Sequence, residues 1–374
     1  MSKTFVVIDQ AAGQKQIEIL DVFNSKFDSQ AIIAGSINER QKKLGSNVKW
    51  EKTIVYNRKN AITRLYTWVV FTIQALFIIS LKYRNAHLFV ITNPPTSVFL
   101  TLVLPNKFSI LVFDLYPDTF YEYGIISKNS IIYTAWAKLN KKIFRNAERI
   151  YTLGESMANR LSNYVNLSKI EVVELWTDSS FLVKKDIQNN WFKEKYALDN
   201  KFVVMYSGNM GITHPVEIVV DLAKSLNDVD EIYFVLIGGG HKYSILEKKI
   251  KDYGLKNIIL MPFLKPTDLP FSFNSASMGV VTLDSKAGEL SVPSKVFDLF
   301  AVGLPVLGIG SETSELSRLL KKYKCGSCFN ESNLTEMVNF TKEVYNNPKY
   351  YHELSENSKM GSNNHGPKNA QKFL

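Results

Sequence analysis

The sequence predicts an α/β protein with two doubly wound domains, each a parallel sheet with helices on both faces. Three observations lead to this prediction. The chain has 374 residues, which is too many for one small core. Short β-branched segments alternate with helical patterns of ten or more residues, as in βαβ units. Glycine-rich loops directly follow several of these strands, where doubly wound sheets bind ligands.

The composition is that of a folded protein, with 45% hydrophobic and 21% charged residues, and it excludes a disordered chain. The net charge of +10 is concentrated in the first half. Through Asp178 there are 22 Lys and Arg against 14 Asp and Glu, or +8, and the remainder has 23 against 21, or +2. This asymmetry indicates an anionic partner such as nucleic acid, a phosphate-rich substrate or an acidic membrane surface. A merely soluble basic surface is the alternative.

We expect an N-terminal domain at residues 1–183 and a C-terminal domain at residues 196–355, joined by the polar stretch Lys184–Lys195. A last segment, residues 356–374, can cross back to the first domain. The predicted strands of the first domain are Thr4–Ile8, Ala31–Ala34, Lys52–Tyr56, Leu88–Thr92, Ser109–Phe113, Arg149–Leu153 and Ile170–Val173. Those of the second domain are Phe202–Tyr206, Ile232–Ile237, Asn257–Met261, Met278–Leu283 and Val306–Gly308.

The two cysteines, Cys325 and Cys328, form a Cys-Gly-Ser-Cys pair. They cannot build a disulfide framework, and without a second pair they cannot supply four zinc ligands. We expect a structural turn there, with a redox role as the alternative. The N-terminus reads as a β-strand without a long apolar signal segment, which predicts a cytoplasmic protein.

The segment Leu65–Leu81 contains no charged residue and must be tested as a membrane span. As a helix it would be about 25 Å long, slightly short of a bilayer core of about 30 Å. A β-branched strand follows almost at once. This order of helix, short loop and strand is typical of an α/β domain. We therefore expect a buried crossover helix rather than a span.

A second segment, Ile132–Arg149, combines apolar and basic residues at helical spacing. The apolar positions are Ile132, Ala135, Trp136, Leu139 and Ile143, and the basic ones are Lys138, Lys141, Lys142, Arg145 and Arg149. A basic amphipathic helix with a tryptophan can lie in the headgroup region of a membrane. A helix packed on a sheet with its charges in water is the alternative.

Two glycine-rich loops follow strands of the second half. The loop Ser207–Gly211 contains Gly208, Asn209 and Gly211 and precedes a predicted helix. Its glycines let the backbone approach a ligand closely, and a helix N-terminus favours an anion. The loop Gly238–Gly240 ends the next strand, and three consecutive glycines indicate a ligand lying against the backbone.

The most informative segment is a polar loop, residues 284–292, that leads into a helix beginning at Pro293 or Ser294. The free amides of the first helical turn can point at phosphates. Lys295 adds a positive charge there, and Asp298, one turn further along the same face, can accept hydrogen bonds from a ribose diol. The arrangement fits a nucleoside diphosphate, and an ordinary capped helix is the alternative.

The run Val292–Val306, Val-Pro-Ser-Lys-Val-Phe-Asp-Leu-Phe-Ala-Val-Gly-Leu-Pro-Val, resembles the donor-site signature of glycosyltransferase family 4, which has the GT-B fold. The two glycine loops fall where that family has its other donor loops. The loop Asp114–Asp118, Asp-Leu-Tyr-Pro-Asp, resembles one in bacterial members that build O-antigen, capsule and exopolysaccharide.

This resemblance implies two Rossmann-like domains facing a cleft and a retaining glycosyltransferase that needs neither a metal nor another cofactor. It implies a nucleotide-sugar donor, with UDP as the preferred nucleotide, and a lipid-linked oligosaccharide acceptor. The expected location is the inner face of the cell membrane, with the protein held there peripherally. Front-face substitution is the expected mechanism, in which the departing phosphate takes the acceptor's proton.

The sequence departs from the family pattern in three places. The family's two acidic residues lie eight apart, but the position eight before Asp298 is a leucine, so the adjacent Glu289 is the candidate for gripping sugar hydroxyls. Asn209 stands where the family frequently has arginine, so neutralisation of the diphosphate would rest more on Lys295 and backbone amides. Asp114 stands where the family often has histidine.

We expect Asp114, Asp118 and Lys295 to be the catalytic groups, with the two aspartates contacting the sugar or orienting the acceptor. Loop capping and turn formation are the alternative for both aspartates. His214 either faces the cleft or has a structural role. The expected nucleotide-sugar contacts are Gly208, Asn209, Gly211, Gly239, Glu289, Pro293, Ser294, Lys295 and Asp298.

Two other functions stay open at this point. A nucleotide-sugar 2-epimerase of the same fold would convert the donor without an acceptor. A basic membrane-surface protein without catalysis would bind anionic vesicles with steep salt dependence and ignore nucleotides. Nucleic acid is not an expected partner, because the sequence has no helix-turn-helix spacing and no aromatic RNA-binding strand.

Overall fold

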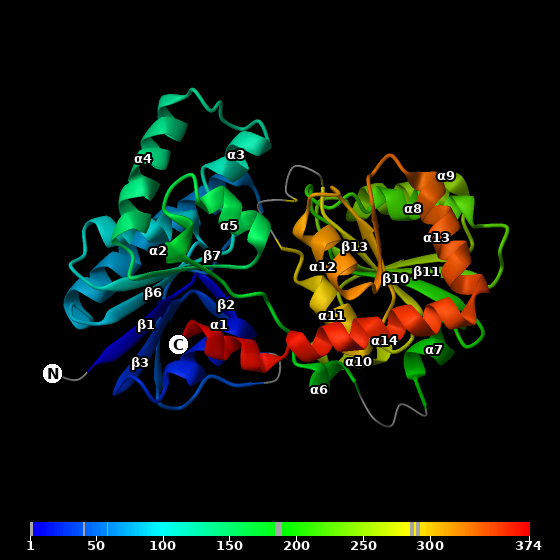
Figure 1. Ribbon diagram of the computed structural model, residues 1–374, viewed down its shortest axis with the longest axis horizontal. Helices are drawn as coiled ribbons and strands as arrows, with labels where there is room; N and C mark the ends of the chain where they lie inside the picture. Colours follow the sequence, from blue (N-terminus) through cyan, green and yellow to red (C-terminus); the bar gives the residue numbers. More distant parts are fainter. Residues whose placement is uncertain (1–2, 40–41, 58, 184–188, 285–287, 289–291) are drawn as a thin grey trace. The chain divides into compact units, whose positions relative to one another are not determined.

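The structure is a computed structural model that describes the chain apart from residues 1–2, 40–41, 58, 184–188, 285–287 and 289–291 (Figure 1). The chain divides into two compact units. The first contains residues 1–174 and 368–374, and the second contains residues 175–367. The main sheet of each unit has only parallel strand pairs among the described residues.

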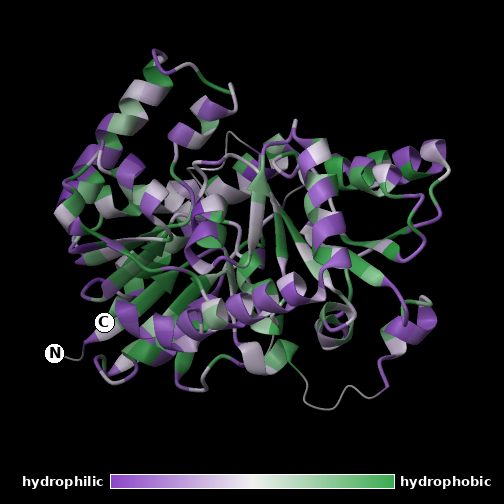
Figure 2. Ribbon diagram, turned by 45° about the vertical axis from the view of Figure 1, so that its right-hand side comes forward, coloured by the Kyte–Doolittle hydropathy of each residue, from purple (hydrophilic) through white to green (hydrophobic). Residues whose placement is uncertain are grey.

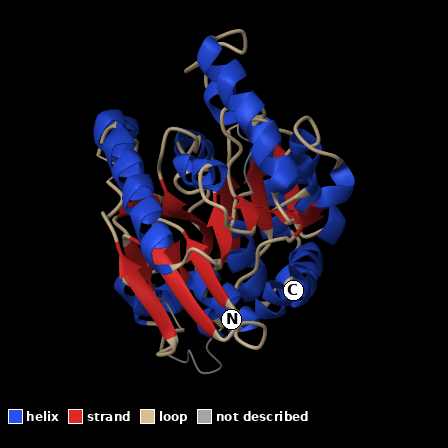
Figure 3. Cartoon of the chain, turned by 90° about the vertical axis from the view of Figure 1, so that its left-hand side faces the viewer, coloured by secondary structure: helices blue, strands red, loops and turns tan. Residues whose placement is uncertain are grey.

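The first unit is built on a seven-stranded sheet in the order β5-β3-β1-β6-β7-β8-β9. Its central strands are continuous apolar runs because helices cover both faces, as Figures 2 and 3 show. Phe5–Ile8 are accordingly fully buried. The strands are β1 (Thr4–Ile8), β3 (Ser29–Ala34), β5 (Val48–Lys52), β6 (His87–Ile91), β7 (Phe108–Val112), β8 (Arg149–Thr152) and β9 (Ile170–Val172), and β2 (Ala11–Gly13) pairs with β4 (Ser36–Asn38).

Helices join these strands, and the C-terminal residues return to the same unit. The side-chain hydroxyl of Tyr151 donates to the carbonyl oxygen of Phe373 over 2.9 Å, and the Phe373 ring packs edge-on against Phe89. The helices are α1 (Gln14–Phe23), α2 (Ala61–Lys82), η1 (Pro95–Leu102), α3 (Asp118–Glu122), α4 (Ile131–Asn146), α5 (Glu155–Leu161), η2 (Leu167–Lys169) and the C-terminal η4 (Pro367–Phe373).

Helix α2 is a crossover helix between β5 and β6, as predicted, but the expectation that it is buried is wrong. Phe71, Ala75 and Ile79 on its inner face are fully buried, whereas Ile62 and Leu81 are each 81% exposed. A crossover helix contacts its sheet along one face only, and much of its other face is also apolar here. By length and composition α2 is long and apolar enough to cross a membrane, and 28% of its most apolar stretch is buried in the protein. Core helices of soluble proteins can have the same length and composition.

The second unit is built on a six-stranded sheet in the order β12-β11-β10-β13-β14-β15. The strands are β10 (Phe202–Asn209), β11 (Ile232–Gly239), β12 (Ile258–Met261), β13 (Met278–Thr282), β14 (Val306–Ile309) and β15 (Gly326–Phe329). The helices are α6 (Ser179–Leu182), α7 (Trp191–Lys195), α8 (Glu217–Ser225), α9 (Tyr243–Tyr253), η3 (Pro266–Asp268), α10 (Leu269–Phe273), α11 (Lys295–Val302), α12 (Glu315–Tyr323), α13 (Leu334–Asn346) and α14 (Pro348–Asn364).

The boundaries of the two units differ from the expected ones. The first unit ends at Glu174 rather than at residue 183, because the amide of Thr177 donates to the carbonyl oxygen of His365 over 2.9 Å. The returning segment begins at residue 368 rather than 356, because α14 packs on α11: the Ser355 hydroxyl donates to the Gly303 carbonyl over 2.7 Å. Part of the predicted linker, residues 184–188, lies outside the described residues.

Three strand predictions need correction as well. The strand expected at Lys52–Tyr56 lies at Val48–Lys52, where pairing with β3 sets Val48 opposite Gln30. The strands that end in glycines are longer than predicted, because β10 and β11 continue as a parallel pair to Asn209 and Gly239. The two predicted glycine loops are therefore largely the ends of two paired strands.

Candidate functional site

The candidate site lies in the second unit, at the carboxyl ends of β10 and β11 and the start of α11. Gly208 of β10 pairs with Gly238 of β11, and Asn209 pairs with Gly239. A Cβ atom on Gly238 would lie 1.9 Å from the Gly208 carbonyl oxygen, so this position requires glycine. Gly240, with φ +137°, is equally restricted, since a Cβ would meet the Met210 carbonyl oxygen at 2.8 Å. Both glycines are therefore required by close contacts within the protein itself.

Lys295, the first residue of α11, lies against the end of β10. Its Nζ atom donates to the Tyr206 hydroxyl oxygen over 2.8 Å and lies 4.5 Å from the centre of the Tyr206 ring. A Cβ atom on Gly208 would lie 2.0 Å from the Lys295 Cε atom, so the glycine makes room for the lysine chain. Tyr206 and Gly208 of β10 thus pack directly against Lys295 of α11. The predicted cation is therefore at the predicted glycine loop.

Burial lowers the pKa of Lys295 to about 7, and the nearby Asp298 carboxylate opposes that shift. The ammonium group therefore lacks full compensation for its desolvation. An anionic ligand would supply that compensation. The Tyr206 hydroxyl, which accepts from Lys295, donates in turn to the Asn209 carbonyl oxygen over 2.6 Å. Burial raises the pKa of Tyr206, so the phenol stays neutral.

His214 joins this cluster, although the sequence left its role open. Its Nδ1 lies 2.7 Å from the Thr282 carbonyl oxygen. A carbonyl can only accept, so Nδ1 carries the proton and Nε2 has none when the ring is neutral. Burial, together with the nearby charge of Lys295, lowers the pKa of His214 to about 4. The ring is therefore neutral near pH 7.

Asp298 lies one turn into α11 and is positioned by a residue that sequence reasoning did not single out. The Thr177 hydroxyl donates to Asp298 Oδ1 over 2.7 Å. Thr177 is itself held in place because its backbone amide donates a hydrogen bond to the His365 carbonyl oxygen. One carboxylate oxygen is thus oriented by the protein, and the acceptor capacity of the carboxylate exceeds that single bond. No sequence signal connects Thr177 with Asp298, since 121 positions separate them.

The remaining predicted contacts surround this cluster. Ser294 is the N-cap of α11, makes no side-chain capping bond and is exposed, while Pro293 is buried beside it. Asn209 is exposed and lies beside Gly211, where a Cβ would meet its side-chain nitrogen at 2.7 Å. Glu289 lies outside the described residues.

One aromatic residue at the site escaped the sequence analysis. A Cβ on Gly239 would lie 3.2 Å from the Phe263 ring, so the ring covers the end of β11. Phe263 follows β12 and is 62% exposed. Its sequence neighbourhood contains no glycine-rich loop and none of the donor-site motifs, so no motif in the sequence marked it.

Asp114 and Asp118 belong to the first unit. Asp114 follows β7 and lines a hollow together with Thr92, Tyr116 and Trp136. Burial raises the pKa of Asp114 to about 6. This carboxyl group is therefore desolvated and can hold a proton at mildly acidic pH.

Asp118 has different surroundings, which favour the structural alternative. It is only 6% exposed, and its Oδ1 accepts a 3.3 Å hydrogen bond from the Tyr133 hydroxyl. Its Oδ2 accepts a hydrogen bond from the Tyr164 hydroxyl. Both carboxylate oxygens are thus used to hold α3, α4 and the segment after α5 together.

The described residues contain no group of three or more His, Cys, Asp or Glu side chains that could hold a metal ion. Both cysteines are free, and Cys325 is buried. Burial raises the pKa of Cys325 to about 12 and that of Cys328 to about 11, so both are thiols rather than reactive thiolates at neutral pH.

The comparison with known families decides the identity of this domain. The model of the family "Glycosyl transferases group 1" matches residues 188–360, which include the paired glycine ends, Lys295 and Asp298. Residues 188–360 belong to the glycosyl transferases group 1 family. The resemblance noted in the sequence is thereby confirmed at the level of this family.

Curated relatives of the glycosyl transferases group 1 domain are bacterial and plant proteins. The chain is 23% identical over 240 residues to WbjE of Pseudomonas aeruginosa, named as a glycosyltransferase, with 63% of this chain and 60% of WbjE covered. It is 25% identical over 181 residues to WcaI of Escherichia coli K12, named as a colanic acid biosynthesis glycosyl transferase, with 48% and 44% covered. The chain thus spans about 60% or less of the length of these relatives.

Solved structures extend the likeness to nearly the whole chain. Anabaena Alr3699/HepE, solved in complex with UDP and glucose, has a TM-score of 0.75 at 10% identity, with 99% of this chain and 98% of that one covered. WaaG, a glycosyltransferase involved in lipopolysaccharide biosynthesis, has a TM-score of 0.70 at 11% identity, with 96% and 95% covered. The GT-B fold, with two Rossmann-like domains, is confirmed.

Proposed function

We propose that the chain is a glycosyltransferase that moves a sugar from a nucleotide diphosphate sugar, a UDP-sugar, to an acceptor in bacterial surface polysaccharide synthesis. The observation that carries the proposal is the position of Lys295. Its desolvated ammonium group lies at a helix N-terminus, beside strand ends that only glycine can form. The family of residues 188–360 and the bacterial relatives support the same activity.

In this proposal the diphosphate lies over the ends of β10 and β11. Lys295 and the first backbone amides of α11 neutralise its negative charge. Asp298, oriented by Thr177, accepts hydrogen bonds from the ribose hydroxyls. UDP is the preferred nucleotide because HepE of the same fold has been solved with UDP and with UDP-glucose. A plant relative of part of the chain is likewise named a UDP-glycosyltransferase.

The proposed reaction retains the anomeric configuration by front-face substitution. The bond between the sugar C1 and the diphosphate oxygen breaks, and the acceptor oxygen bonds to C1 on the same face. The acceptor proton passes to the departing phosphate. Lys295 stabilises charge that develops on the leaving group, so we expect transfer without a metal or other cofactor.

The acceptor is proposed to be a lipid-linked oligosaccharide at the inner face of the cell membrane. The basic charge of residues 1–178 supports an acidic membrane surface as the place of reaction. Asp114, desolvated in its hollow, is the proposed acceptor-orienting group of the first unit. Asp118 is proposed to have a structural role, because both of its carboxylate oxygens accept hydrogen bonds from tyrosine hydroxyls.

Thermal unfolding with UDP, GDP, ADP and TDP in the presence of EDTA tests the donor site. A ligand at a hundred times its dissociation constant adds about 2.7 kcal/mol to the free energy of unfolding, which moves the midpoint by a few degrees. A shift with UDP alone is expected. No shift with any nucleotide would contradict the proposal, and conversion of a UDP-sugar without acceptor would favour an epimerase.

A further inference from the structure

The outward side of α2 is largely apolar from end to end, with Gln74 and Ser80 as exposed polar residues. Its large exposed side chains recur every three or four residues, which places them on one side of the helix. A helix of 22 residues is about 33 Å long. We call this surface the outer face of α2, and it consists of Ile62, Leu65, Tyr66, Val69, Ile73, Phe77 and Leu81, which are 43% to 81% exposed.

The opposite side of α2 is firmly packed, so the helix cannot be a segment detached from the domain. Trp68 is 5% exposed and Phe71 is fully buried. Polar contacts add to this packing: the Thr67 carbonyl accepts from Gln10 over 2.9 Å, and the Gln74 side chain accepts from the Ile54 amide over 2.8 Å. Crossing a bilayer would require these contacts to break. A partner that contacts the outer face must therefore bind to the folded domain with α2 in place.

Contiguous exposed apolar surface of this extent marks an interaction site in soluble proteins. Outside α2 and α4, the exposed apolar residues that the structure describes, such as Ile245 at 47%, do not form such a series. Each apolar side chain that leaves water contributes favourably, in proportion to the apolar area that it buries. Several of them entering an apolar phase together would give stable binding.

Helix α4 is the second part of the same surface. The chain passes from β5 to β6 through α2 and from β7 to β8 through α4, in the same direction across the sheet, so right-handed connections place both helices on one face. A ring cluster supports this: Tyr116 lies 6.3 Å from Trp68 of α2 and 6.2 Å from Trp136 of α4, between ring centroids.

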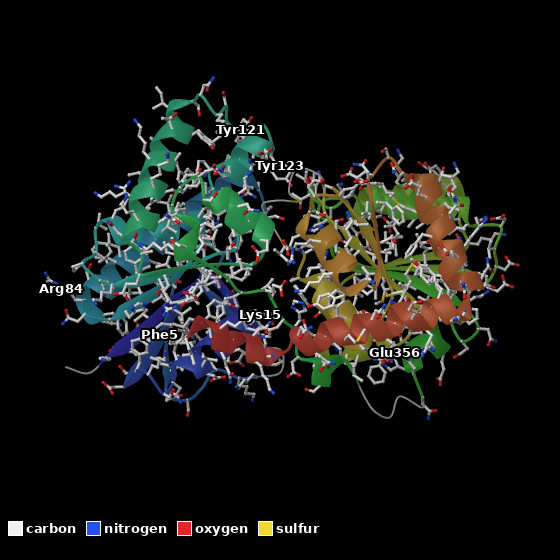
Figure 4. All side chains as sticks on the ribbon, viewed as in Figure 1. Phe5, Lys15, Arg84, Tyr121, Tyr123 and Glu356 are labelled. Atoms are coloured by element: carbon white, nitrogen blue, oxygen red, sulfur yellow. The ribbon has the colours of Figure 1, made fainter. Side chains whose placement is uncertain are left out.

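The exposed part of α4 combines apolar and basic side chains. Ile131 is 87% exposed and Ile132 is 61% exposed at its N-terminal end. Further along, the basic side chains Lys138, Lys141, Lys142 and Arg145 are exposed. Arg84, just after α2, points outward at the edge of the first unit (Figure 4). A long apolar stripe beside exposed cations is the pattern of a protein surface that lies in a membrane interface.

We propose that the outer face of α2, together with the exposed side of α4, docks on the surface of an anionic lipid bilayer. The apolar side chains of α2 enter the boundary between headgroups and acyl chains, and the cations of α4 lie among the anionic headgroups. The charge of +8 in residues 1–178 complements such a surface and not a second, equally basic copy of the chain. The inference deepens the membrane-surface part of the proposed function and does not depend on the donor site.

Vesicle flotation of the full chain tests the proposal, with phosphatidylcholine vesicles that contain or lack phosphatidylglycerol. The wild type is expected to float with the anionic vesicles and to bind them more weakly at high salt. Ile73→Glu should lower the partition coefficient about tenfold, because the side chain no longer enters the apolar boundary. Lys141→Glu should lower it about fivefold or more on anionic vesicles only.

Ile245→Glu on α9 is the matched control, since Ile245 is 47% exposed and Ile73 is 48% exposed. It should leave the partition coefficient within about twofold of the wild type. Equal loss of binding in both variants, or no vesicle binding by the wild type, would overturn the proposal. So would a dimer that Phe77→Glu converts to a monomer, because a second copy would then cover the face.

Resistance of wild-type binding to alkaline extraction would also overturn it, in favour of a span. The UDP-dependent thermal shift of Ile73→Glu separates this inference from the donor site. A retained shift with lost flotation supports the docking surface whatever the sugar donor. If Ile73→Glu instead lost the UDP-dependent shift and still floated with vesicles, Ile73 would have no role in docking. The docking surface and the donor site would then not be independent.

Discussion

The Lys295 side chain runs through the space that a Cβ atom on Gly208 would occupy, with only 2.0 Å between that position and Lys295 Cε. The two residues come from strand and helix segments 87 positions apart in the sequence. Gly208 is thus required because a larger residue would collide with the side chain of Lys295. A substitution at Gly208 therefore tests whether the position of Lys295 matters for the donor site.

Gly208→Ala should displace the lysine chain and lower turnover about tenfold or more, while the fold survives because a flexible side chain can move. The cost in stability should be about 1 kcal/mol, since φ at Gly208 is +153°. Steady-state kinetics with a UDP-sugar and urea unfolding measure the two effects. Gly254→Ala is the control: φ is +62° and no atom lies within 4 Å, so it should lose stability without losing turnover.

Lys295→Ala should lower turnover about a hundredfold and donor affinity much less, because charge develops on the leaving diphosphate during the reaction. Single-turnover rates and equilibrium binding of the UDP-sugar separate the two quantities. A wild-type rate in this variant would remove the residue from the mechanism.

Lys295 should also give the free protein a characteristic dependence on pH. Its pKa is about 7 when folded and about 10.4 when unfolded, so the unfolded chain binds more protons between these values. The contribution of this group to the free energy of unfolding should therefore rise as the pH increases from about 7 toward 10. Urea unfolding of Lys295→Met across this range should lack the rise, and an unchanged slope would show that the lysine titrates normally.

Asp298→Ala should weaken donor binding about tenfold to a hundredfold while the fold survives, because a charged acceptor of the ribose hydroxyls is lost. Thr177→Val removes only the 2.7 Å hydrogen bond that orients the carboxylate, so it should cost less, about fivefold. Isothermal titration with UDP measures both. Equal affinity of wild type and Asp298→Ala would contradict the ribose contact.

Asp114→Asn should remove a loss of folding stability that the wild type shows as the pH rises. The folded pKa of about 6 lies above the unfolded value of about 3.9, so this carboxyl group stabilises the fold at low pH and loses that contribution as the pH rises through 6. The variant should therefore be more stable than the wild type at pH 7 and slower in transfer to the acceptor. Thermal unfolding from pH 4 to 7 measures the first effect.

Asp118→Asn is the matched comparison for Asp114→Asn. It weakens an acceptor for two tyrosine hydroxyls, so it should destabilise the fold by about 1–3 kcal/mol with little specific effect on turnover. A stable but inactive Asp118→Asn variant would restore this residue to the mechanism.

Local patterns in the sequence were sufficient for much of this protein. Alternating strands and helices predict parallel sheets, because parallel neighbours need a crossover of about a dozen residues or more, which is usually a helix. The strand β10, the glycines after it and the start of α11 at Lys295 are local features, and their chemistry predicts an anion site without long-range information. Membership of residues 188–360 in the glycosyl transferases group 1 family agrees with that local signature.

Long-range packing decided the rest. Periodicity shows that residues 61–82 form an apolar helix, but only the sheet beneath it determines that Phe71 is buried and Phe77 is 62% exposed. Asp118 and Asp114 look alike in one short loop, yet tyrosines from distant segments bond the first and a hollow desolvates the second. Thr177 and Phe263 reach the site only through folding, because contacts between distant segments leave no spacing in the sequence from which they can be predicted.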